Sequence, residues 1–244
     1  MTSDLSDAAR TRGALILHGF TGHPSSVVSL ADAFTEAGFD VEMPLLPGHG
    51  TTVADMIPTR WADWSAAAEA ALERLQRRCS QVVVAGLSMG GTLALWLATC
   101  HPDLHGVIAV NPAGAPQPDE ILVALEELVE QGIETMPGIG SDIAQEGEVE
   151  QAYDETPIAA LISLMREGVA PLVDHYGEAR VPLLLVTSRQ DHVVDPAQSD
   201  LVAGAWGGGV TRMVLDRSFH VATQDLDRAD IAARAVAFAV EPMP

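Results

Sequence analysis

The sequence predicts an α/β protein built on an open, mostly parallel sheet. Short apolar runs rich in β-branched residues alternate with longer segments of helical spacing nearly throughout the chain. The 244 residues, 48% of them hydrophobic, suit one globular domain with a large core. In sheets of this kind ligands bind at the carboxyl ends of the strands, so functional residues are expected directly after them.

The boundaries of the first elements can be assigned in order along the chain. An apolar run at 14–18 ends in a glycine-rich turn, which indicates a strand followed by a loop. Serines that can cap its start and Gly38 after its end mark a helix over 27–37. A second strand, 39–44, leads into a loop rich in proline and glycine, and helical spacing predicts a helix over 59–78.

Residues 81–98 predict a strand, a sharp turn and a helix, and the turn carries the pattern G-x-S-x-G. Gly86 and Gly90 stand two residues either side of Ser88, where larger side chains would collide with the neighbouring strand and helix. Ser88 would then present its hydroxyl above the carboxyl end of a strand, beside the N–H groups of a helix N-terminus. This context favours a nucleophile over a serine that merely caps the helix.

The regular alternation of strands and helices breaks in the middle of the chain. A helix is predicted over 118–130, a glycine-rich stretch follows, and a second helix is predicted over 157–176. This stretch is too long for a simple connection between two strands. We expect a helical insertion over 113–180 that caps the strand ends of a core formed by 1–112 and 181–244.

Three further strands complete the predicted sheet, at 105–111, 181–188 and 210–215. A helix to about residue 204 follows the second of them, and a helix over 225–240 closes the chain. The loops after the last two strands therefore meet Ser88 at one edge of the sheet.

A serine hydroxyl is a weak nucleophile, so Ser88 needs a histidine to take its proton and a carboxylate to orient that histidine. Among the eight histidines, His220 stands in the loop after the last strand, whereas the others are better explained as structural or exposed residues. Asp191 is the preferred carboxylate because Asp195 is explained by helix capping. The predicted catalytic residues are Ser88, Asp191 and His220.

The transition state of acyl transfer also needs donors for the negative oxygen that develops on the substrate. The backbone N–H of Met89, directly after the nucleophile, is one candidate. The backbone N–H of Phe20, in the glycine-rich turn after the first strand, is the other. Because backbone groups would supply these bonds, changing either side chain should alter fit more than chemistry.

Composition excludes several classes of function. With 34 acidic and 13 basic residues the formal charge is −21, which disfavours nucleic acids and anionic lipid surfaces as partners and favours neutral or cationic substrates. All basic residues are arginine, which excludes Schiff-base chemistry and a phosphate-binding P-loop lysine. Neither a metal cluster nor a cofactor motif is visible, so none is expected.

Localisation and thiol chemistry give simpler expectations. No apolar run reaches the ~18 residues of a membrane span and no leader is visible, so we expect a soluble, cytoplasmic protein. Cys79 and Cys100 are too few for a disulfide framework, and two free thiols are expected.

Five motifs together carry a family resemblance: HGFTG, LPGHG, GLSMGG, SRQDHVVDP and SFH. Over about residues 12–240 the chain resembles the bacterial carboxylesterase and monoacylglycerol lipase branch of the α/β-hydrolase superfamily. The order serine, aspartate, histidine is the order of that fold. The resemblance implies a small helical cap over an acyl pocket. The short N-terminal stretch implies a compact sheet of six or seven strands, without the two opening strands of larger relatives.

The function implied is a serine carboxylic ester hydrolase for short- to medium-chain acyl esters or monoacylglycerols, acting through an acyl-enzyme. Leu161, Ile162 and Met165 would line the acyl pocket, although packing of helix faces on the sheet explains them equally well. The same triad also serves carbon–carbon bond hydrolysis, lactone opening and acyl transfer, and a non-catalytic ligand receptor is the alternative from another class. A monomer or a homodimer is expected.

Overall fold

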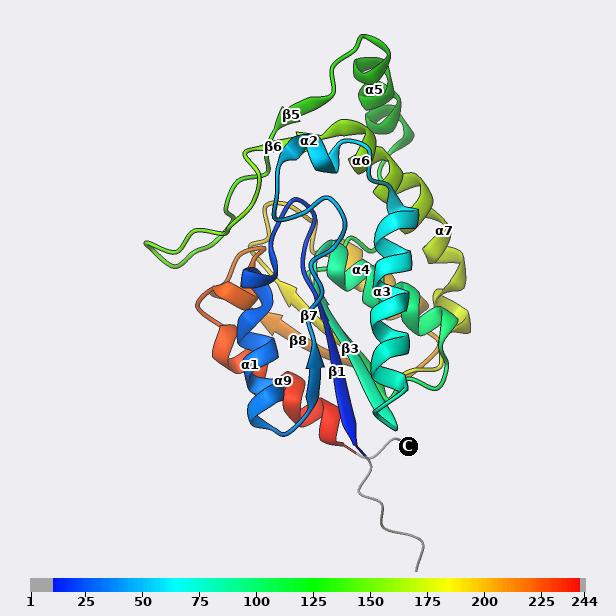
Figure 1. Cartoon of the computed structure of the whole chain (residues 1–244), viewed down its shortest axis with the longest axis vertical. Coiled ribbons are helices and arrows are strands. Elements are labelled where there is room, and N and C mark those ends of the chain that lie inside the picture. Colours follow the sequence, from blue (N-terminus) through cyan, green and yellow to red (C-terminus); the bar gives the residue numbers. More distant parts are fainter. Residues whose placement is uncertain (1–10, 242–244) are drawn as a thin grey trace, which may run out of the picture.

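In the computed structural model, which describes residues 11–241, six parallel strands form one sheet with helices on both faces (Figure 1). The strands are β1 (Arg12–Leu17), β2 (Asp40–Glu42), β3 (Gln81–Leu87), β4 (Gly106–Val110), β7 (Leu183–Ser188) and β8 (Val210–Leu215). Their order is β2-β1-β3-β4-β7-β8, and every neighbouring pair is parallel. The predicted fold class is confirmed.

Helices cover the two faces of the sheet in separate groups. One face carries α1 (Val28–Glu36) and α9 (Arg228–Val240), and the other carries α3 (Trp61–Gln76), α4 (Met89–Cys100) and α8 (Ala197–Ala205). Successive side chains of a strand point to opposite faces, so Leu15 and Leu17 pack toward α3 and α4 while Ala14 and Ile16 pack toward α1 and α9. Both faces of the inner strands β1, β3, β4 and β7 are buried, which is why these strands read as nearly continuous apolar runs.

The strand order reverses between β1 and β3. The chain passes from β1 to β2 at the edge and returns through the short helix α2 (Val53–Met56) and α3 to β3, on the other side of β1. Loops leaving the carboxyl ends of two such strands turn in opposite directions and leave a crevice between them. The turn after β1 and the G-x-S-x-G turn after β3 both open at this point.

The insertion between β4 and β7 is more varied than two helices. Its elements are α5 (Asp119–Glu130), β5 (Thr135–Pro137), β6 (Glu155–Pro157), α6 (Ile158–Ser163), a π-helical segment (Leu164–Val169), α7 (Ala170–Leu172) and a 3-10 turn (Val173–Glu178). The helix over 118–130 is confirmed as α5. Strands β5 and β6 pair antiparallel, a small ribbon that three-residue strands give too little pattern to predict.

The prediction of one regular helix over 157–176 is wrong, because the helical path here changes between α, π and 3-10 geometry. Pro171 has no N–H to donate and its ring disfavours regular α-helical bonding to the preceding turn. A Cβ on Gly168 would lie 2.7 Å from Cδ2 of Trp61, so the backbone here approaches α3 closely. The π-helical segment accommodates both constraints within a continuous helical path.

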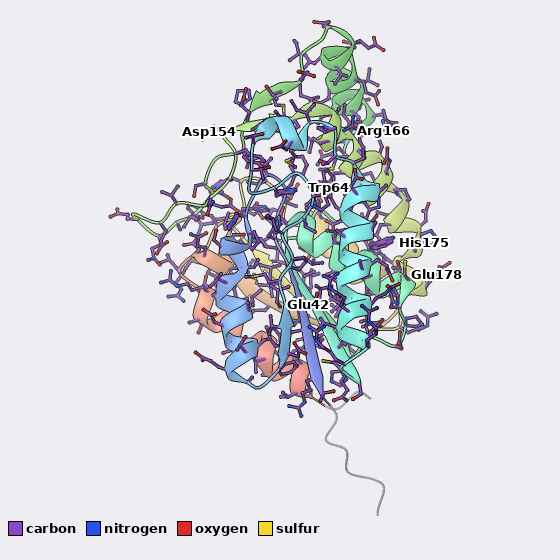
Figure 2. The ribbon with its side chains drawn as sticks, in the orientation of Figure 1. Glu42, Trp64, Asp154, Arg166, His175 and Glu178 are labelled. Atoms are coloured by element: carbon purple, nitrogen blue, oxygen red, sulfur yellow. The ribbon has the colours of Figure 1, made fainter. Side chains whose placement is uncertain are left out.

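The two halves of the insertion lie in different places. The first half, with α5, β5 and β6, extends beyond the carboxyl ends of the strands at the top of Figure 1. Arg166 of the second half, labelled in Figure 2, ties the two halves together because its Nε donates to Glu126 Oε1 of α5 at 2.6 Å. The second half runs beside α3 and joins the core, where Tyr176 is fully buried and donates to the carbonyl of Gly114 at 3.0 Å.

Two sequence expectations concern features outside the site. Cys79 is buried, Cys100 is exposed and both are free thiols, as predicted. Within residues 11–241, no helix is both long enough and apolar enough to cross a bilayer.

Candidate active site

Ser88 occupies the turn between β3 and α4 in a strained conformation. Its φ of 54° and ψ of −118° lie outside the regions that non-glycine residues normally adopt. A Cβ on Gly86 would overlap the carbonyl of Gly90, and a Cβ on Gly90 would overlap the carbonyl of Leu17 at the end of β1. The two glycines therefore let strand, turn and helix pack at the distance that a sharp elbow requires, as the sequence predicts.

His220 and Asp191 form a buried pair at the same edge of the sheet. His220 Nδ1 lies 2.8 Å from Asp191 Oδ2, and the two side chains are only 7% and 2% exposed. The other carboxylate oxygen of Asp191 accepts from the N–H groups of Val193 at 2.9 Å and Val194 at 2.8 Å. Because a carboxylate only accepts, the proton of the ring stands on Nδ1, which leaves Nε2 as a base.

Ser88 and His220 line the same small cavity, of about 20 Å³, at the crevice between β1 and β3. The three residues predicted from separate parts of the sequence thus lie at one site. His192, the neighbour of Asp191, lines the larger cavity near Ser88, but its exposed ring bonds to Asp142 at 2.7 Å and does not pair with Asp191. This arrangement has the parts of a nucleophile, a base and a group that orients the base.

The two residues predicted as oxyanion donors, Phe20 and Met89, lie on neighbouring turns beside Ser88. Met89 is the first residue of α4, so its N–H has no acceptor within the helix. A Cβ on Gly19 would lie 3.5 Å from Cβ of Ser88, which brings the turn carrying Phe20 directly beside the elbow. Phe20 and Met89 both line the large cavity with Ser88.

Buried His18 braces this turn, and the buried ring of His49 packs edge-on against it with ring centroids 4.9 Å apart. His18 Nε2 accepts from the N–H of Leu46 at 3.1 Å, while Nδ1 lies 2.9 Å from the carbonyl oxygen of Gly19. Burial lowers the pKa of His18 to about 3, assisted by His49, and burial lowers the pKa of His49 to about 4. Both rings are neutral at physiological pH, so they are structural groups, as predicted from the sequence.

A cavity of about 490 Å³ opens above Ser88, between the sheet and the insertion. Its walls are mainly apolar side chains of the insertion: Ile121, Leu122, Leu125, Met136, Ile139, Leu161, Leu164 and Met165. The polar residues in its lining are Ser88, Gln117, Asp142, His192 and Gln198, and no arginine lines it. An apolar wall with few polar groups suits an uncharged, chain-like ligand.

Two of the three residues predicted for the acyl pocket, Leu161 and Met165, line this cavity, but Ile162 does not. Ile162 lines a separate groove with Arg60, Glu126 and Glu167 on the outer side of α6. On α6, Leu161 faces the cavity, whereas Ile162, about 100° further round the helix, faces the groove. The prediction for Ile162 is therefore corrected.

Two carboxylates of the insertion reach the site without having been predicted. Asp142 and Glu150 both line the small cavity beside Ser88 and His220. They lie in the irregular stretch between β5 and β6, where neither helical nor strand periodicity assigns a direction to a side chain. Burial raises the pKa of Glu150 to about 7, although the charge of His220 opposes the shift.

Replacing Glu150 with glutamine should stabilise the protein more at high pH than at low pH. The folded state holds the proton of Glu150 up to about pH 7, whereas the unfolded chain releases it near its usual value of 4.5. Stability therefore falls as the pH rises between these values, and the glutamine variant escapes that loss. Urea unfolding should show a gain from Glu150→Gln that is about 2 kcal/mol larger at pH 8 than at pH 5.5.

The exposed neighbour Glu146 supplies the matched control. Glu146→Gln should change the free energy of unfolding by less than about 0.5 kcal/mol at either pH. Equal gains from Glu150→Gln at both pH values would show that burial does not protonate this carboxyl.

Comparison with known proteins places the chain among hydrolases. A match to the family described as serine aminopeptidase, S33, covers residues 10–227. The thermostable monoacylglycerol lipase of Bacillus sp. (strain H-257) is 38% identical over 93% of this chain and 89% of its own length. The carboxylesterase of Bacillus subtilis (strain 168) is 25% identical over 89% of this chain and 87% of its own.

Solved structures agree with the sequence relatives. One from a study of LipS and LipT, two metagenome-derived lipolytic enzymes, is 39% identical and superposes with a TM-score of 0.88 over 93% of both chains. The monoacylglycerol lipase of Paleococcus ferrophilus shares the fold, with a TM-score of 0.75 and 18% identity over 93% of this chain and 94% of its own.

A parallel sheet with a serine elbow at its switch point, and a histidine–aspartate pair at the same edge, defines the α/β-hydrolase superfamily. Within that superfamily, the chain belongs to the family described as serine aminopeptidase, S33.

Proposed function

We propose that this protein is a serine carboxylic ester hydrolase that acts on short- to medium-chain acyl esters or monoacylglycerols. The observation that carries the proposal is the strained Ser88 at the elbow, which shares a cavity with the base of the buried His220–Asp191 pair. The identity of 38% to a monoacylglycerol lipase over most of both chains supports the same reaction.

In the proposed mechanism Ser88 Oγ attacks the ester carbonyl carbon while His220 Nε2 takes the serine proton. The N–H groups of Phe20 and Met89 stabilise the oxyanion of the tetrahedral intermediate. The C–O bond to the alcohol then breaks, and His220 returns the proton to the departing alcohol. Water, deprotonated by the same histidine, attacks the acyl-enzyme and releases the carboxylic acid with Ser88 restored.

Asp191 has a supporting role in this mechanism. Its Oδ2 accepts from His220 Nδ1, which keeps the ring oriented and stabilises the imidazolium formed when Ser88 loses its proton. Two backbone N–H groups hold its Oδ1, so the carboxylate itself cannot turn away from the histidine. An acceptor held in this way fits the orienting group of a triad.

The division of the molecule fits a core of residues 1–112 and 181–244 with an insertion, 113–180, that caps the site. The larger cavity, walled by apolar side chains of this insertion, is the proposed acyl site. The smaller cavity, with Asp142 and Glu150, has a volume of about 20 Å³ and so has room for little more than a water molecule beside Ser88 and His220. Because the residues that line either cavity include no arginine, a neutral ester fits better than an anionic one.

Covalent labelling together with a chain-length series tests the proposal. A fluorophosphonate probe should label Ser88 stoichiometrically, as identified by mass spectrometry of the labelled peptide. For p-nitrophenyl esters and monoacylglycerols from butyrate to palmitate, kcat/KM should rise roughly fourfold per added methylene, or about 0.8 kcal/mol, until the cavity is full.

The outcomes separate the enzyme from its alternatives. Failure of the probe to label Ser88, with no turnover of any ester, would favour a ligand receptor on the same fold. Labelling without ester hydrolysis would point to another reaction of the same triad, such as acyl transfer or lactone opening.

A further inference from the structure

Asp142 is the residue through which the insertion touches both loops of the His220–Asp191 pair. It lies between β5 and β6, its side chain is 14% exposed, and it lines both cavities. Its contacts are with backbone atoms of the two loops as well as with one side chain.

One oxygen of this carboxylate joins the two loops directly. Asp142 Oδ2 accepts from the N–H of His220 at 3.0 Å and from the N–H of His192, next to Asp191, at 3.1 Å. The main-chain carbonyl of Asp142 also accepts from the N–H of Val221 at 3.1 Å. A single residue thus fixes the separation between the loop that carries the acid and the loop that carries the base.

The other oxygen is occupied by a side chain. His192 Nδ1 lies 2.7 Å from Asp142 Oδ1, and the His192 ring packs edge-on against Phe219, with centroids 4.7 Å apart. The carboxylate is therefore held on both sides and cannot rotate away from His220 without breaking several contacts.

The opposite side of His220 is tethered to the sheet. Asn111, at the end of β4, donates to the carbonyl of His220 at 2.8 Å. The segment that carries Asp142 is itself anchored, because buried Asp225 accepts from the N–H groups of Ala144 at 2.8 Å and Gln145 at 2.9 Å. His220 is thus held between the core, through its carbonyl, and the insertion, through its N–H.

We propose that Asp142 is a positioning residue for His220, by which the insertion sets the geometry of the base relative to Asp191 and Ser88. The role rests on the proposed function and adds to it a part of the reaction machinery outside the triad. A displacement of about 1 Å between reacting groups can cost about 100-fold in rate, so a tether on the backbone of the base acts on kcat.

Three substitutions of Asp142 separate its roles. Asp142→Ala removes the acceptor. Asp142→Glu keeps the charge and the oxygens but moves them by about one methylene, roughly 1.5 Å. Asp142→Asn keeps one acceptor oxygen for the two backbone N–H groups and removes the charge. The exposed Glu146→Ala, in the same segment, is the matched control.

Steady-state hydrolysis of p-nitrophenyl butyrate by the full chain tests the proposal, with thermal unfolding of each variant as the measure of folding. We expect kcat to fall roughly 10- to 100-fold in Asp142→Ala and about 5- to 20-fold in Asp142→Glu, with KM changed less than about threefold. Asp142→Asn should recover kcat to within about fivefold of the wild type, and Glu146→Ala should match it.

Other outcomes overturn the role. If the wild type is active and either folded variant, Asp142→Ala or Asp142→Glu, keeps the wild-type kcat, the positioning role is refuted. The proposed function is then unaffected. A change confined to KM would make Asp142 a substrate contact instead. If Asp142→Ala does not fold, Asp142→Glu alone decides between these results. A wild type that neither turns over esters nor reacts with a fluorophosphonate would remove the proposed function and the positioning role together.

Discussion

Ser88→Ala is expected to lower kcat for ester hydrolysis by about 10⁴- to 10⁶-fold, because the variant has no hydroxyl to form the acyl-enzyme. The residual rate would come from the oxyanion donors and the acyl cavity, which can still bind and polarise the ester. The fluorophosphonate probe should no longer label the protein. The unfolding temperature should stay within a few degrees of that of the wild type. Residue 88 keeps its strained backbone conformation whether its side chain is serine or alanine.

Ser199→Ala is the matched control for this loss. Ser199 is a buried serine of α8 that lines neither cavity. Its substitution should leave kcat within about twofold of the wild type. Retention of more than about a tenth of the wild-type kcat by purified Ser88→Ala would assign the nucleophile to another residue.

The elbow could be predicted because its determinants are contiguous in the sequence. Three valines, the glycines at 86 and 90 and the apolar helix formers after them each restrict the same short stretch, and the backbone of Ser88 adopts the strained conformation that they imply. The loop positions of Asp191 and His220 followed from a general property of parallel sheets, whose strands all end at one edge.

The contributions of the insertion could not be predicted in the same way. Asp142 bonds to His220 across 78 positions of sequence, and Glu150 lies in an irregular stretch outside any helix or strand. Periodicity assigns a face only within a regular element, so it said nothing about either carboxylate. Periodicity also failed for Ile162. Helical spacing shows that a helix has apolar faces, but it does not show which face lies toward the ligand cavity.

Gly90→Ala is expected to prevent folding of the core or to destabilise it by more than about 4 kcal/mol. An added Cβ would overlap the carbonyl oxygen of Leu17 and lie 2.7 Å from the carbonyl oxygen of His18. Both obstacles are backbone atoms, of the inner strand β1 and of the turn beside the oxyanion donors, so no rotation of a side chain relieves them. Urea unfolding followed by tryptophan fluorescence and circular dichroism should show little or no cooperative transition.

Gly204→Ala makes the same chemical change where the surroundings are open. Gly204 lies in α8 and an added Cβ would have no neighbour within 4 Å, so this variant should gain up to about 1 kcal/mol from the better helix propensity of alanine. The contrast between the two variants isolates the steric requirement of the elbow from any general effect of losing a glycine. If folded Gly90→Ala kept its stability within about 1 kcal/mol of the wild type, the close approach of α4 to β1 that presents Ser88 would be wrong.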